Sequence, residues 1–167
     1  MSGREPLSAL EARLGHVFAD RALIETALTH VSVQNAPNYQ RLEFLGDRVL
    51  GLAVAELLSA AFPGAREGEL SKRLAELVRR EACVDVALEW RVGPHLRLGP
   101  GERQTGGEAK PAILGDVAES IIGATFLDAG WDAARALVAR FWSRRVKTQS
   151  RRLVDPKTEL QEWAQAR

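Results

Sequence analysis

The stretch RLEFLGDRVLGLAVAELL, residues 41–58, decides the fold of this chain. Apolar residues recur around its whole circumference, and this pattern predicts a long helix that is largely buried. Glu43 and Asp47 interrupt the apolar pattern four residues apart. A rotation of about 100° per residue places the two carboxylates about 40° apart on the helix surface, on a stripe that continues through Leu50 and Val54. The sequence therefore predicts a buried helix that carries two acids on one face.

A second pair of acids lies in GDVAESIIGATFLDAG, residues 115–130. Asp116 and Glu119 are three residues apart, which makes them neighbours on one face of a helix. Burying several unpaired carboxylates together is costly, so a positive charge should lie among them. Arginines such as Arg41 or Arg73 could supply that charge, and so could a divalent cation. Three histidines and one cysteine give zinc little support, whereas an all-oxygen site suits Mg²⁺ or Mn²⁺.

Helical periodicity extends through the rest of the chain, and no segment shows a sustained alternation of apolar and polar residues. Asp20 is a good N-cap for the second helix, and Pro111 can open a later one because its missing amide is unpaired there in any case. The predicted helices cover residues 7–14, 20–30, 41–61, 67–90 as one or two helices, 111–127 and 131–146. The glycine-rich residues 91–109 are expected to form a loop. The fold class predicted is all-α.

Composition bounds the kind of protein. The 167 residues suit one domain with a substantial core, and no apolar run is long enough to span a membrane. The first 15 residues lack the apolar core of a secretory signal, and the single cysteine suits a reducing compartment, so a cytoplasmic location is expected. The net charge is only +1, but residues 144–152, RRVKTQSRR, are densely basic. This segment is either a solvated helix end or an edge that contacts phosphates.

Five segments together resemble the ribonuclease III family, in order and at suitable spacing. They are ALTHVS (27–32), RLEFLGDRVLG (41–51), EGELSK (67–72), LRLGPGE (96–102) and GDVAESIIGATFLDAG (115–130). The resemblance implies a helical endonuclease domain of the ribonuclease III type over residues 1–150. DPKTELQEWAQ, residues 155–165, resembles the beginning of the double-stranded-RNA-binding domain of bacterial members. Residues 151–167 are therefore expected to be a linker and the truncated start of such a domain.

The resemblance also implies an activity, which is cleavage of double-stranded RNA that depends on Mg²⁺, with Mn²⁺ as a possible substitute. The expected products carry 5′-phosphate and 3′-hydroxyl ends with short 3′ overhangs, and the expected roles are in ribosomal and messenger RNA processing. The family's central acids map onto Glu43, Asp47, Asp116 and Glu119 as metal ligands, with Asp47 and Glu119 as catalytic residues. Asp47 is expected to bind a second metal or to orient water. Carboxylates that hold metal ions suit phosphodiester hydrolysis.

Three further positions acquire expected roles from the resemblance. Gln40 stands where many members have Glu, and it is expected to contact RNA or water rather than to supply a negative ligand. Glu67 matches an acid near the RNA cleft, although it is also an acid favoured at a helix N-terminus. Phe44 is expected to insert into a partner subunit of a homodimer, with a contact inside its own subunit as the alternative. Arg48 departs from the family, in which Ser is common, and it adds a cation beside Asp47.

Two other functions compete with this interpretation. A catalytically silent relative could bind double-stranded RNA as a scaffold, but such a protein has no need of four clustered acids. A metal-dependent hydrolase of small phosphate compounds is also conceivable. The glycine-rich segment LGPGERQTGG, residues 98–107, matches no phosphate-binding loop motif, which disfavours that activity.

Overall fold

The computed structural model describes the backbone of residues 5–165 and the side chains of residues 5–149. The helices are α1 (Leu7–Leu14), α2 (Arg21–Ala27), α3 (Gln40–Ala61), α4 (Glu67–Leu77), α5 (Arg80–Trp90), η1 (Gly93–His95), α6 (Pro100–Gln104), η2 (Gly107–Ala109) and α7 (Pro111–Gln165). Within these residues the structure has no β-strand beyond an isolated bridge between Thr29 and Arg97. The predicted all-α class is confirmed.

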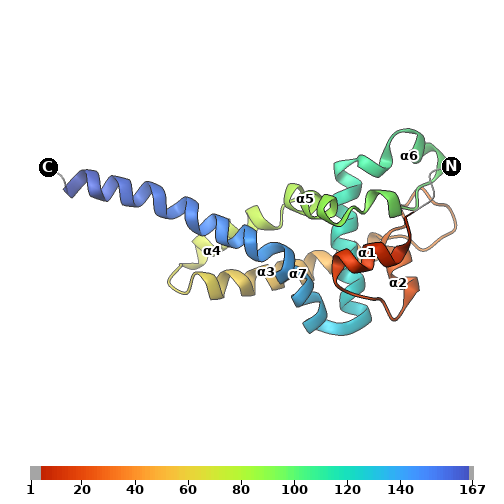
Figure 1. The fold of residues 1–167 in the computed structure, drawn as a ribbon, viewed down its shortest axis with the longest axis horizontal. Helices are drawn as coiled ribbons and strands as arrows, with labels where there is room; N and C mark the ends of the chain where they lie inside the picture. The colour runs from red at the N-terminus through yellow and green to blue at the C-terminus, as the bar shows by residue number, and fades with distance from the viewer. Residues whose placement is uncertain (1–4, 166–167) are drawn as a thin grey trace.

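Helices α3 and α7 cross at the centre of the domain (Figure 1), and two glycines set how closely they approach. A methyl group on Gly46 of α3 would overlap the carbonyl oxygen of Glu119 in α7. A methyl group on Gly123 of α7 would in turn overlap the carbonyl oxygen of Leu42. The two backbones therefore touch directly, which no other residue type allows. This crossing brings the acid-bearing turns of the two helices side by side.

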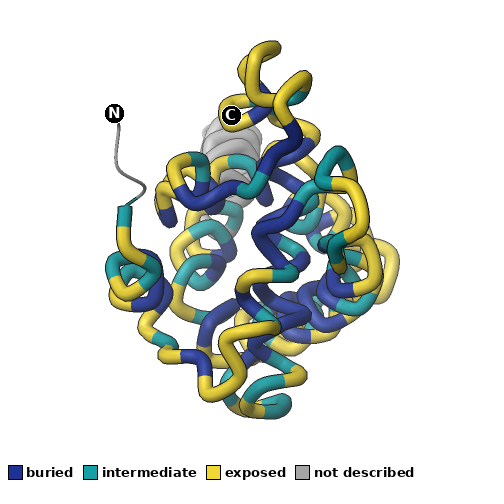
Figure 2. The backbone as a smooth tube through the Cα atoms, turned by 90° about the vertical axis from the view of Figure 1, so that its right-hand side faces the viewer, coloured by how far each residue is buried: buried dark blue, intermediate teal, exposed yellow. Residues whose placement is uncertain are grey.

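The core surrounds this crossing, and Figure 2 shows buried stretches of several helices meeting inside the domain. Leu50 and Val54 of α3 are fully buried, as the stripe predicted, and so are the large side chains of Trp90 and Trp142. Trp142 is also held by a 2.8 Å hydrogen bond from its indole N–H to the carbonyl of Leu77. Burying each such side chain contributes about 1.5–3 kcal/mol to folding. Packing of α5 and α7 therefore fixes the second half of the domain.

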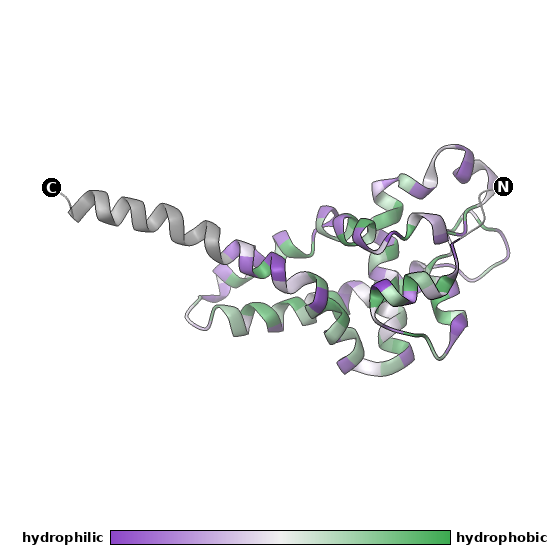
Figure 3. Ribbon diagram, in the orientation of Figure 1, coloured by the Kyte–Doolittle hydropathy of each residue, from purple (hydrophilic) through white to green (hydrophobic). Residues whose placement is uncertain are grey.

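The prediction that α3 is largely buried is wrong for one face of the helix. The helix is apolar along most of its length (Figure 3), yet Phe44 is 68% exposed and Leu52 is 59% exposed. Because α3 packs on α7 with its opposite face, these apolar side chains point away from the core of their own chain.

Helix ends follow the sequence closely. Gly15 ends α1 with a positive φ of 74°, and the Asp20 carboxylate caps α2 by accepting a hydrogen bond from the Ala22 amide at 2.9 Å. The predicted break near residues 128–130 occurs at Gly130, whose φ of 83° and ψ of −173° interrupt α7. The following helical stretch first packs in the core, where Val138 and Trp142 are fully buried, and then extends from the body of the domain to Gln165 (Figure 1). The predicted domain boundary at residue 150 lies within this helix and stays a prediction, because side chains from residue 150 onward lie outside the described part.

The glycine-rich residues 91–109 were expected to be a plain loop, and this expectation is wrong in part. They contain the short helices η1, α6 and η2. Proline stands in the first turn of both η1 and α6, where its fixed φ suits a helix and its missing amide costs nothing.

Among the described residues, no helix is long and apolar enough to cross a bilayer.

Candidate metal centre

Three of the four predicted acids converge where α3 crosses α7. One carboxylate oxygen from each of Glu43, Asp116 and Glu119 lies within 4.8 Å of the other two. Glu43 lies in the first turn of α3, and the other two acids lie on successive turns of α7. All three are half-buried, so they are partly removed from water but still reachable from the surface. The helix crossing, rather than any local sequence pattern, creates this cluster.

Burial makes all three carboxylates harder to ionise, and repulsion from neighbouring carboxylates adds to the effect for Glu43 and Glu119. Burial and then repulsion from Glu43 and Asp116 raise the pKa of Glu119 to about 7. Burial raises the pKa of Glu43, and the neighbouring Asp116 adds to the increase. The pKa of Asp116 is raised by burial as well. A group of acids that resist ionisation in this way is a site where a positive charge would bind favourably.

The arginine that faces the cluster is neither of those considered from the sequence. Arg73 is buried and pairs with Glu69 at 2.7 Å, and its guanidinium lies 3.9 Å from the ring centroid of Phe62. Arg41 is exposed and has no ion pair with the acids in the described structure. Arg80, at the start of α5, is the arginine whose charge lowers the pKa of all three acids. None of the three forms an ion pair with it within 4 Å in the described structure, so it offsets their charge only from a distance.

Asp47 does not join the cluster, although it lies on the same helix one turn after Glu43. Its carboxylate pairs with the guanidinium of Arg48, and both side chains are partly exposed. The same guanidinium lies 5.3 Å from the ring centroid of Phe44. Arg48, which departs from the family pattern, therefore contacts both Asp47 and the exposed Phe44. The metal-binding and catalytic roles of Asp47 stay predictions.

Two residues beside the acids were missed in the sequence. The hydroxyl of Tyr39 donates a hydrogen bond to Asp116 Oδ2 at 3.4 Å, and the thiol of Cys83 donates one to Glu119 Oε1 at 3.8 Å. Burial and nearby carboxylates raise the pKa of Cys83 to about 12 and raise the pKa of Tyr39 as well, so both groups keep their protons. Tyr39 could have been noticed because it adjoins Gln40. Cys83 could not, because only the packing of α5 on α7 brings it to Glu119.

The predicted accessory residues lie at the starts of two helices, and Gln40 shares the first turn of α3 with Glu43. Gln40 is exposed at the start of α3, and Glu67 is exposed at the start of α4, where it accepts a 2.6 Å hydrogen bond from Ser71. The helix-terminal position of Glu67 fits the macrodipole explanation. His30 shares a 2.8 Å hydrogen bond with Ser32. The roles of Gln40 and Glu67 toward RNA stay predictions.

The basic segment is partly engaged within the domain. Arg145 pairs with Glu89 at 2.8 Å and Arg144 approaches the same carboxylate at 3.5 Å, while the side chains of residues 150–152 lie outside the described part.

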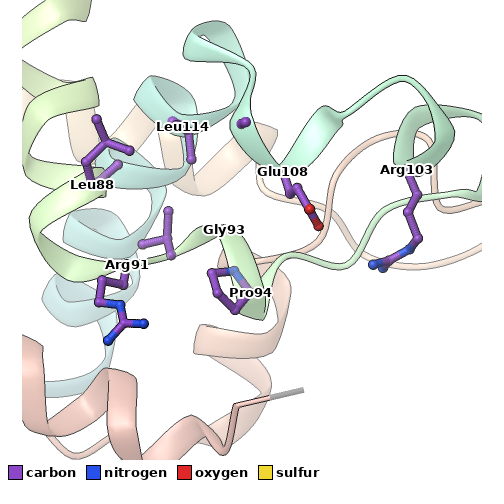
Figure 4. Close-up of a pocket in the computed structure, with 10 residues that line it drawn as sticks. Leu88, Arg91, Gly93, Pro94, Arg103, Glu108 and Leu114 are labelled. Carbon is purple, nitrogen blue, oxygen red and sulfur yellow. The ribbon is translucent and has the colours of Figure 1, made fainter. Parts of the chain in front are cut away.

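A separate hollow of about 540 Å³ lies between the end of α5, η1, η2 and the start of α7. Figure 4 shows Arg91 and Arg103 at this hollow with Leu88 and Glu108. None of the three clustered acids lines it.

The cluster fits a hard divalent cation. Its donors are all carboxylate oxygens, which Mg²⁺ and Mn²⁺ prefer, and the half-exposed position leaves room for the waters that Mg²⁺ retains. Cys83 donates its proton to Glu119 rather than offering a free thiolate, so a site for a soft metal is disfavoured. The geometry therefore supports the oxygen-ligand prediction for Glu43, Asp116 and Glu119.

Comparison with known proteins gives a consistent set of relatives. The family model described as Ribonuclease-III-like matches residues 20–146. The chain is 58% identical to Ribonuclease 3 of Azorhizobium caulinodans over all of its length and 73% of the relative's. It is 57% identical to Ribonuclease 3 of Methylocella silvestris, again over all of its length and 72% of the relative's.

A solved structure shares the fold. It is the nuclease domain of ribonuclease III from Campylobacter jejuni, in a study of structural flexibility in the region involved in dimer formation. The two chains superimpose with a TM-score of 0.81 and are 39% identical, and the match covers 83% of this chain and 97% of the other.

Proposed function

Since this chain belongs to the ribonuclease III family and is an endoribonuclease of that type, we propose that it cleaves double-stranded RNA in an Mg²⁺-dependent reaction at Glu43, Asp116 and Glu119. The observation that carries the proposal is the convergence of three carboxylates from two helices within 4.8 Å. Such a group opposes folding through mutual repulsion, so its presence points to a use in binding a cation.

The three acids would hold the cation, and each would contribute one negative charge. A bound divalent cation supplies activation of water and neutralisation of charge on phosphate oxygens. Arg80 adds a positive charge on the α5 side of the cluster. This charge can partly offset the repulsion between the acids and an RNA phosphate. Asp47 lies on the same helix at a more exposed position, and we assign to it the orientation of water or a second metal. The expected products carry 5′-phosphate and 3′-hydroxyl ends with short 3′ overhangs.

A scaffold that only bound RNA is the less favoured function. Three half-buried carboxylates facing a polyanion would repel it unless a cation neutralised them. The carboxylates by themselves therefore oppose RNA binding, and their presence favours a catalytic role over a scaffold role. Processing of ribosomal and messenger precursors in the cytoplasm is the role that we assign on the family resemblance.

A cleavage assay tests the proposed function. Labelled RNA, as a duplex and as its separate single strand, is incubated with the protein in Mg²⁺, in Mn²⁺ and in EDTA. We expect cleavage of the duplex in either metal, little cleavage of the single strand, and none in EDTA. Duplex binding without cleavage in both metals would favour the RNA-binding scaffold. Competition by small phosphate esters would favour a metal-dependent hydrolase of small phosphate compounds.

We also propose that the protein acts as a homodimer through the exposed face of α3. Phe44 is 68% exposed and Leu52 is 59% exposed on this helix, and neither has a place in the core of its own chain. A self-complementary interface would bury both side chains twice, once from each subunit. This exposure argues against the alternative that Phe44 packs inside its own subunit.

Phe44→Ala is expected to weaken dimerisation about 1000-fold, because two symmetric aromatic anchors worth roughly 2 kcal/mol each are lost and every 1.4 kcal/mol is about tenfold. Sedimentation equilibrium across a concentration series measures the dissociation constant. Leu88→Ala is the matched control, since Leu88 is exposed to a similar extent, 59% against 68% for Phe44, but lies on α5. A wild-type protein that is monomeric at micromolar concentration would overturn the dimer, as would equal effects of the two substitutions.

A further inference from the structure

Each of the two α7 acids accepts a hydrogen bond from a buried side chain that lies outside α7. We propose that Tyr39 and Cys83 are positioning residues that orient Asp116 and Glu119 for the divalent cation. Tyr39 precedes α3 and donates to Asp116 Oδ2 at 3.4 Å, and Cys83 on α5 donates to Glu119 Oε1 at 3.8 Å. The inference rests on the proposed function, because orientation of these carboxylates matters only if they bind a metal.

The hydrogen bonds leave half of each carboxylate available. Within the described structure, the second oxygen of Asp116 and that of Glu119 accept no hydrogen bond, and the carboxylate of Glu43 accepts none at all. Each α7 acid therefore has one oxygen fixed by the protein and one free for a ligand. Partners of this kind fix the direction of a ligand and keep it from turning away when the site is empty.

Tyr39 is itself held firmly, which a positioning residue requires. Tyr39 is only 4% exposed, and its backbone amide donates to the carbonyl of Thr29 at 3.0 Å. Its own carbonyl accepts a 2.8 Å hydrogen bond from the amide of Glu43. One residue thus contacts the side chain of Asp116 and the backbone of Glu43. Tyr39 in this way sets the position of an α3 acid relative to an α7 acid.

Cys83 gives a weaker but well-enclosed contact. It is completely buried, and its thiol is 3.9 Å from the carbonyl of Val78 as well as 3.8 Å from Glu119. Because a thiol has one proton and is a weak donor, it serves one acceptor at a time. The contribution of Cys83 should therefore be smaller than that of Tyr39, and a serine hydroxyl should be able to replace it.

Measuring Mn²⁺ affinity without RNA tests the inference. Free Mn²⁺ is counted by electron paramagnetic resonance as wild type, Tyr39→Phe, Cys83→Ala and Cys83→Ser are titrated. We expect Tyr39→Phe to weaken binding about tenfold, at the low end of what the loss of such a partner costs a metal site. Cys83→Ala should weaken binding about threefold because its thiol is the poorer donor, and Cys83→Ser should restore most of the loss. Thermal melting in EDTA confirms that each variant is folded.

Val86→Ala is the matched control for packing. Val86 is fully buried one turn further along α5, and no hydrogen bond joins its side chain to the acids. It should lower the melting temperature without changing Mn²⁺ affinity. The inference is overturned if Tyr39→Phe binds Mn²⁺ as tightly as wild type, if Cys83→Ser binds as weakly as Cys83→Ala, or if Val86→Ala loses as much affinity. Failure of the proposed function looks different, because wild type itself would then neither bind Mn²⁺ nor cleave the duplex.

Discussion

Glu119→Gln is expected to lower single-turnover cleavage of an RNA duplex in Mg²⁺ at least about 1000-fold, or about 4 kcal/mol of transition-state stabilisation. Gln keeps the size of the side chain, and its carbonyl oxygen can still accept the thiol proton of Cys83. It removes one of three negative charges and leaves a neutral ligand for the cation. The loss should therefore fall on the chemistry rather than on the fold.

Two measurements separate these effects. In EDTA the variant should melt no lower than wild type, because burial, and then repulsion from Glu43 and Asp116, already raise the pKa of Glu119 to about 7. Duplex binding in Ca²⁺ should persist. Glu81→Gln on the exposed side of α5 makes the same chemical change away from the cluster and should cleave normally. Near-wild-type cleavage by a folded Glu119→Gln protein would contradict the carboxylate mechanism.

Gly46→Ala is expected to destabilise the protein by about 3 kcal/mol, although alanine is the better helix former by about 1 kcal/mol. The added methyl group would overlap the carbonyl oxygen of Glu119, and this backbone atom cannot move without parting α3 from α7. A loss of this size should lower the melting temperature by about 10 °C for a chain of this length. Chemical denaturation and thermal melting both measure it.

The site should suffer together with the fold. Parting the helices moves Glu43 away from Asp116 and Glu119, so Mn²⁺ affinity should fall even in the molecules that remain folded. Gly68→Ala is the matched control, since Gly68 is also helical and a methyl group there meets nothing within 4 Å. It should leave stability unchanged or raise it. A Gly46→Ala protein as stable as wild type would show that the helices do not depend on this contact.

Much of the fold was predictable because it depends on local pattern. Helical periodicity located the long helices, Asp20 marked the start of α2, and the glycine at residue 130 marked the break in α7. The short helices within residues 91–109 were missed because glycine and proline both suggested a loop, although proline also suits the first turn of a helix, as in η1 and α6. Periodicity overestimated the burial of α3 because an apolar surface that binds a partner has the same sequence pattern as one buried in its own chain, and only the family resemblance pointed to an exposed Phe44.

The site was predictable only in its composition. Spacing placed Asp116 and Glu119 on one face, but their meeting with Glu43 depends on a helix crossing that no local pattern specifies. For the same reason Asp47 was grouped with the cluster, whereas in the structure its carboxylate pairs with Arg48. The packing of α5 brings the charge of Arg80 near the acids and the thiol of Cys83 to Glu119, so Arg41 and Arg73 were equally plausible partners before the structure was known.

The most direct test of the central claim is the position of Mn²⁺ in crystals of this protein, located by anomalous X-ray diffraction. We expect a strong anomalous peak at coordination distance from carboxylate oxygens of Glu43, Asp116 and Glu119, which lie within 4.8 Å of one another. The peak should disappear in Glu119→Gln crystals at the same Mn²⁺ concentration. A wild-type peak elsewhere in the domain, or none at saturating Mn²⁺, would contradict the assignment of these three acids as the metal centre.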